Sequence, residues 1–114
     1  MQGMWLIVHK KTGNKKYVFH INAEFEEIIP MFLKNRQKDV GLMIESLIKQ
    51  DFDAIRVIGH NMKGCGRGYG FDNITDIGRA IQFAAESKDA EEIRKQIQEL
   101  KDFLENVEIL YTKL

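Results

Sequence analysis

Residues 52–71 read FDAIRVIGHNMKGCGRGYGF, and this stretch decides the fold. Its apolar face recurs every three or four positions, as on one side of an α-helix, and comprises Ile55, Ile58, Gly59, Met62, Cys65 and Tyr69. Asp51 and Asp53 lie just before this face and are of a residue type that caps the start of a helix. Glycines at 64, 66, 68 and 70 weaken the helix towards its end. The stretch therefore predicts an amphipathic helix that packs against other helices.

The sequence before this helix keeps the same helical spacing. Apolar residues recur at helical intervals between Phe25 and Ile48, with the single proline, Pro30, near the beginning. Because proline is tolerated close to a helix start, the pattern predicts a short first helix that ends at Pro30 and a longer one after it.

Two more helices are predicted after residue 71. One begins near Asp72 or Asn73, and the other follows Asp89, which caps it, with Glu92 three residues on as in a capping box. The apolar residues of the last helix are spaced 3-4-3-4-3, like the seam of a bundle: Ala90, Ile93, Ile97, Leu100, Leu104 and Val107. Together the four amphipathic helices predict an all-α fold, an antiparallel four-helix bundle with an additional short N-terminal helix.

The first twenty residues follow a different pattern. Apolar runs at 5–8 and 17–19 flank a polar turn at 10–16, which predicts an extended or hairpin-like segment. Two strands alone are marginally stable in water unless they pack on something. Two alternatives therefore remain open for residues 1–20: a strand-like extension that rests on the bundle, or a leader that is foreign to the fold. Residues 21–114 are assigned to the bundle.

Length and composition restrict the class of protein. The 114 residues suffice for one domain, and the 17 basic and 17 acidic residues balance, unlike those of a general nucleic-acid binder. The apolar runs are much shorter than the ~20 residues that cross a bilayer. The single cysteine, Cys65, precludes an intramolecular disulfide and fits a reducing compartment. We expect a cytoplasmic protein without nucleic-acid or membrane partners.

Neither a metal nor a nucleotide cofactor is expected. His9, His20, His60 and Cys65 lack the spacing of a metal site. The glycines between 64 and 70 match neither the dinucleotide-binding pattern nor the Walker pattern, and they follow a predicted helix rather than a strand. The chain is therefore not expected to phosphorylate itself from ATP.

His60 is the residue that most directly indicates a chemical function. On a helical wheel it lies more than about 90° from the centre of the apolar face. The same side of the wheel carries three cations, Arg56, Lys63 and Arg67. Positive charge disfavours the imidazolium form, so a neutral, nucleophilic ring is expected, and the cations would neutralise phosphoryl oxygens. These residues alone favour the alternative interpretation, a solvated basic face with an incidental histidine.

The stretch 58–71 resembles the signature of histidine phosphotransfer domains, His-x-x-Lys-Gly followed by a glycine six residues later. The resemblance extends from about Ile21 to Val107. It implies that His60 is phosphorylated, that Lys63 supports the phosphoryl group, and that the small residue Gly64 admits a receiver domain. Arg56 and Arg67 are expected to bind at the same surface. Cys65 stands where serine is common in the family and is expected to be a small, buried residue.

Two residues beyond this stretch extend the resemblance. Members of the family often place a glutamine about 22 residues after the histidine, where it hydrogen-bonds the imidazole, which implies this role for Gln82. Glu86 lies where some relatives carry a basic residue, which implies an influence on partner choice or on the lifetime of phosphohistidine.

The function implied by the resemblance is that of a phosphocarrier rather than an enzyme. His60 would accept a phosphoryl group from an aspartate of a receiver domain, in a response regulator or a hybrid sensor histidine kinase, and pass it to another receiver. The protein is expected to be a monomer. Two alternatives remain: the phosphoacceptor module of a chemotaxis-type histidine kinase, and a bundle that binds receivers without being phosphorylated.

Overall fold

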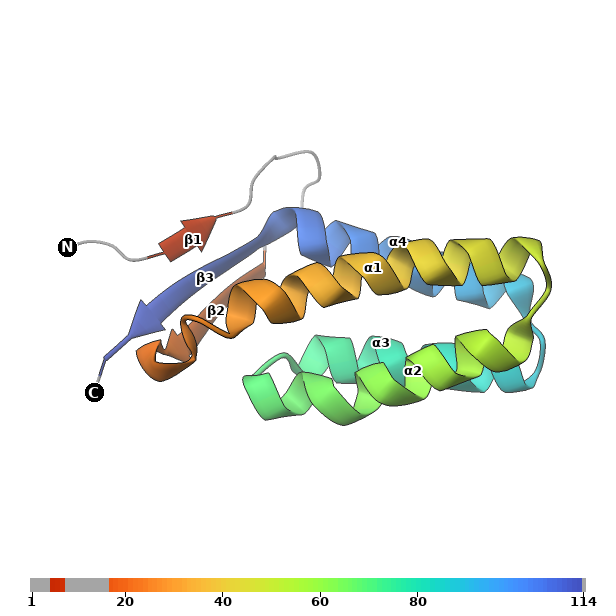
Figure 1. Ribbon diagram of the computed structural model, residues 1–114, viewed down its shortest axis with the longest axis horizontal. Helices are drawn as coiled ribbons and strands as arrows, with labels where there is room; N and C mark the ends of the chain where they lie inside the picture. Colours follow the sequence, from red (N-terminus) through yellow and green to blue (C-terminus); the bar gives the residue numbers. More distant parts are fainter. Residues whose placement is uncertain (1–4, 8–16, 114) are drawn as a thin grey trace.

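A computed structural model describes residues 5–7 and 17–113 of the chain, with side chains from Tyr17 onward. Within these residues the chain forms four α-helices, three strands and two short 3-10 helices (Figure 1). The helices are α1 (Ile29–Ile48), α2 (Phe52–Gly66), α3 (Asp72–Glu86) and α4 (Ala90–Asn106). The prediction of a mostly helical fold with four principal helices is confirmed.

Two of the predicted helix starts are capped by aspartate side chains. Asp51 accepts a hydrogen bond from the backbone N–H of Ala54 at 3.1 Å, and Asp89 accepts one from Glu92 at 3.1 Å. Each cap satisfies one of the backbone donors that the first turn of a helix leaves without an intrahelical partner. The sequence therefore located the starts of α2 and α4 correctly.

The short helix expected before Pro30 is not confirmed. A 3-10 helix, Ala23–Phe25, lies there instead, and Pro30 belongs to the first turn of α1. Proline lacks an N–H, but the N–H groups of a first helical turn have no intrahelical acceptor, so Pro30 costs α1 no hydrogen bond.

The helices pack in two layers. Helices α1 and α4 contact each other in one layer and α2 and α3 in the other, while α1 contacts α2 and α3 contacts α4 across the layers (Figure 1). The buried side chains between them are mostly isoleucine, leucine and methionine. Within the described part of the chain, none of the helices is both long and apolar enough to cross a membrane.

A small sheet lies at one end of the helices. Its strands are β1 (Trp5–Ile7), β2 (Tyr17–Asn22) and β3 (Val107–Thr112), in the order β1-β3-β2 (Figure 1). Strand β3 pairs antiparallel with β1 and parallel with β2. The hairpin-like alternative is wrong in its pairing, because β3 separates the two N-terminal strands. The predicted polar turn at 10–16 lies outside the described residues.

Strand β3 also corrects the predicted end of the last helix. Val107 was expected on the helical seam, but its backbone is extended, with φ −79° and ψ 140°. The side chain is nonetheless buried, as is that of Ile109. The apolar character of Val107 was therefore interpreted correctly and its secondary structure was not.

An aromatic cluster joins the sheet to the helices. The ring of Phe71, which is fully buried, lies 4.9 Å from that of Phe19 in β2, 5.4 Å from that of Phe32 in α1 and 5.8 Å from that of Phe103 in α4, between centroids. Such aromatic contacts contribute beyond the area they bury. The predicted division of the chain at residue 20 thus falls inside β2, a strand whose side chains contact the helices.

Candidate functional site

Helices α2 and α3 approach each other unusually closely at glycines. A methyl group on Gly59 of α2 would lie 2.8 Å from the backbone nitrogen of Gln82, and one on Gly78 of α3 would lie 2.5 Å from that of Lys63. Real side chains do not tolerate such distances, so both positions require glycine as the helices now stand. The contact brings the turn of α3 that carries Gln82 against the turn of α2 that carries His60.

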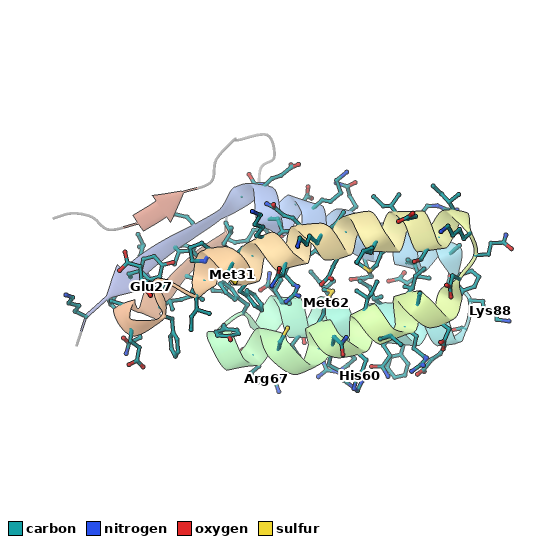
Figure 2. The ribbon with its side chains drawn as sticks, viewed as in Figure 1. Glu27, Met31, His60, Met62, Arg67 and Lys88 are labelled. Carbon is teal, nitrogen blue, oxygen red and sulfur yellow. The ribbon has the colours of Figure 1, made fainter. Side chains whose placement is uncertain are left out.

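His60 lies on the outside of the molecule. Its side chain is exposed, and Figure 2 shows it on the side of α2 that faces away from α1, whereas Met62 lies between the two helices. Among the described residues, the imidazole has no hydrogen bond or ion pair. The outward orientation predicted from the helical wheel is confirmed, and the ring is open to a partner molecule.

The three cations around His60 are less alike than the sequence suggested. Arg56 donates to the carboxylate of Asp53 at 2.9 and 3.1 Å. Arg67 lies 3.5 Å from a carboxylate oxygen of Asp72.

Lys63 is half-buried and has no acidic partner among the described residues. The positive field expected around His60 is therefore partly neutralised on Arg56 and Arg67, and Lys63 is the cation left to contact an anion.

Gln82 carries a polar atom without a partner. Its amide nitrogen donates to Glu86 at 3.4 Å, while its amide oxygen is buried and accepts no hydrogen bond from the described residues. A buried acceptor that lacks a donor costs free energy, and it can accept from an N–H group that comes near. Glu86, expected near the site, is thus connected to it through Gln82.

The surface one turn after His60 is open. Gly64 is exposed, and a methyl group built there would meet nothing within 4 Å. Two large apolar side chains are also exposed on α2 and α3: the exposed fraction is 42% for Val57 of α2 and 65% for Phe83 of α3. Steric access and apolar area together suit the approach of another protein.

Cys65 has neighbours that the sequence did not reveal. A guanidinium nitrogen of Arg36 lies 3.2 Å from its sulfur, and Arg36 also forms an ion pair with Asp39 at 2.8 Å. Burial raises the pKa of Asp39, and the adjacent Arg36 offsets part of that effect. Arg36 and Asp39 both belong to α1, far from Cys65 in sequence. The sequence therefore shows that these two residues are three positions apart on one helix, but it does not show that they lie near Cys65.

The histidines do not form a metal centre in the part of the structure that is described. Within it, no three side chains of histidine, cysteine, aspartate or glutamate gather in a way that could hold an ion. His20 is exposed on β2, and His9 lies outside the described residues.

Comparison with known proteins gives no match. Neither a family model, nor a curated protein, nor a solved structure matches the chain.

Proposed function

We propose that the protein is a histidine phosphotransfer domain that carries a phosphoryl group on His60 between the aspartates of receiver domains. The observation that carries the proposal is the exposed imidazole of His60 beside the open surface at Gly64. The antiparallel four-helix bundle typical of the family is part of the proposal.

The transfer exchanges one bond for another. A neutral ring nitrogen of His60 attacks the phosphorus of a receiver's aspartyl phosphate, the N–P bond forms, and the P–O bond to the aspartate breaks to release its carboxylate. The reverse reaction delivers the phosphoryl group to a second receiver. Catalysis of this kind relies on positioning and on neutralising the phosphoryl oxygens, which is the role proposed for Lys63.

The neighbours of His60 support this assignment. The close contact of Gly59 and Gly78 holds Gln82 next to the turn of His60, where its unpartnered amide oxygen can accept from the ring N–H. A hydrogen bond to one ring nitrogen fixes which nitrogen is left as the nucleophile. Arg56 and Arg67, held by acidic partners, are proposed to contact the rim of the receiver.

The partners proposed are response-regulator receivers and hybrid sensor histidine kinases, met by a monomeric carrier in the cytoplasm. The single cysteine and the balanced charge of the chain are compatible with this setting. The chain would act as a phosphocarrier without an ATP-dependent activity of its own.

The direct test is phosphoryl transfer from a receiver. The purified chain is incubated with receiver domains phosphorylated by acetyl phosphate, and the modified residue is located by mass spectrometry. We expect an acid-labile phosphoryl group on His60 that is absent from His60→Gln. His20→Gln is the matched control, because His20 is also exposed but lies on β2, and it should be labelled like the wild type.

Two outcomes would contradict the proposal. Labelling of His60→Gln as strong as that of the wild type would place the acceptor elsewhere. Stable binding of receivers without any labelling would favour the interaction module instead of the carrier.

A second variant tests the docking surface. Gly64→Arg adds a long side chain where space is open, so the fold should be retained while a receiver is kept away from His60. We expect transfer to fall by at least about tenfold with an unchanged circular dichroism spectrum, since a displacement of about 1 Å at a reacting centre can cost more than that. Gly68, four residues further along the chain, also has open space around it, so Gly68→Arg is the variant with which Gly64→Arg is compared.

A further inference from the structure

The layer of helices opposite the His60 surface carries an apolar groove. It has a volume of about 360 Å³ and is lined by Ile44, Leu47 and Ile48 of α1 and by Ile97 of α4. Ile44 is 41% exposed and Ile48 is 79% exposed, although both belong to a helix with a buried face. Two exposed isoleucines lie side by side in this groove. Covering them with another apolar surface would remove them from water and so lower the free energy.

The polar rim of the groove is basic. It is formed by Arg94, Gln98 and Lys101, which together extend over two turns of α4. Neither cation has an acidic partner among the described residues, in contrast to Arg36, Arg56, Arg67 and Arg79, which are all paired. Within the described residues, the charges of Arg94 and Lys101 are therefore not neutralised by an ion pair.

The dimensions of the groove fit a helix. A second hollow of about 230 Å³ continues it past Lys101 to Leu104 and Glu105, opposite Gln37 and Val40 of α1. Along each helix the lining residues extend over about 16 Å, or three helical turns. Two neighbouring helices form ridges between which the side chains of a third helix can pack.

We infer that the groove between α1 and α4 is a second docking surface, and that its occupant is an amphipathic helix of a partner protein with acidic residues beside an apolar stripe. The isoleucines receive the stripe, and Arg94 and Lys101 pair with the acidic side chains. The groove and His60 lie on opposite layers of the molecule (Figure 1; Figure 2), so a protein bound there leaves the phosphotransfer surface free.

The inference is tested with a designed peptide. A fluorescent helical peptide of about 14 residues carries leucines at i, i+3, i+4 and i+7 and glutamates on both flanks, and a second version has lysines in place of the glutamates. Binding to the full chain is measured by anisotropy, and the site is mapped by amide chemical shifts. We expect saturable binding of the glutamate peptide, with shifts on α1 and α4 and none around His60.

Matched variants locate the contacts. Ile48→Lys should weaken binding by about tenfold or more, because it removes an apolar side chain from the interface. Leu42→Lys is its control, since Leu42 is 51% exposed on α1 but does not line the groove. Arg94→Glu should reverse the preference between the two peptides, while Lys95→Glu, on the next residue of α4 and outside the lining, should not. His60→Gln should bind the peptide like the wild type.

Three results would overturn the inference. One is that the glutamate peptide binds no more tightly than the lysine peptide, whether both bind or neither does. Another is a set of shifts that surrounds His60 instead of the groove. The third is a dimer of the chain in sedimentation experiments that Ile48→Lys dissociates, because the occupant would then be a second copy.

Discussion

Lys63 is the cation near His60 that no acidic side chain of the described residues neutralises. A charge that is already paired has less to offer a phosphoryl oxygen than one that is free, so the three cations should differ in their effect on transfer. We expect Lys63→Ala to slow transfer by about tenfold to a hundredfold, the equivalent of one hydrogen bond to a charged group.

Arg56→Ala is the comparison and should have the smaller effect, since Asp53 already holds that guanidinium. Rapid-quench transfer kinetics and a urea melt of each variant check this. A loss of stability by Lys63→Ala beyond about 0.5 kcal/mol would indicate a structural role instead.

Asp39 makes the stability of the fold depend on pH. Burial raises the pKa of its carboxyl group above the ordinary value, so the folded protein holds this proton to higher pH than the unfolded chain does. The contribution of Asp39 to the free energy of unfolding is therefore greatest in acid and falls as the pH rises from about 4 through the raised pKa.

Urea unfolding between pH 4 and pH 7 should show this loss in the wild type and not in Asp39→Asn. Asp76→Asn is the control, because Asp76 forms a similar pair with Arg79 on an exposed surface. Parallel pH profiles for the wild type and Asp39→Asn would contradict the prediction.

At the scale of the helices, two glycines of α2 should respond in opposite ways to the same substitution. A methyl group on Gly59 meets the backbone of α3 at 2.8–2.9 Å, so Gly59→Ala forces α2 and α3 apart and should cost about 1–3 kcal/mol. Gly64→Ala meets nothing and should stabilise the helix by about 0.5–1 kcal/mol, because alanine loses less backbone entropy than glycine.

Urea melts measure both effects, and transfer assays should show a larger loss for Gly59→Ala, which displaces Gln82. Equal stability of the two variants would mean that the close contact of α2 and α3 contributes little.

The helical wheel predicted the orientation of His60, since solvent exposure along one helix follows from its apolar period. It also placed Gly59 on the inner face. It could not predict that the backbone of α3 approaches Gly59 and Gly78, because that contact depends on how two helices cross. The wheel also did not show that Arg56 pairs with Asp53, three residues earlier on the same helix, or that Arg67 pairs with Asp72 at the start of α3.

At the scale of the whole molecule, the sheet was the part of the fold that was hardest to predict from the sequence. The apolar residues of β3 continue the spacing of α4, and its parallel partner β2 lies some ninety residues earlier in the chain. Local periodicity cannot report such a pairing, because a short apolar run fits either a strand or a helix until its partner is known.

The remaining alternative for the N-terminal residues, a leader foreign to the fold, can be tested on β2. Phe19 is half-buried, with its ring 4.9 Å from that of Phe71 and 5.7 Å from that of Phe103, while the adjacent Val18 is 48% exposed. If β2 belongs to the core, Phe19→Ala should lower the free energy of unfolding by about 2–3 kcal/mol, near the lower end for a fully buried phenylalanine. Val18→Ala should change it by less than about 0.5 kcal/mol. Both variants should still accept a phosphoryl group, since the sheet lies at one end of the helices and His60 on the outer surface of α2. A Phe19→Ala variant as stable as the wild type would mean that the helices fold without the strand.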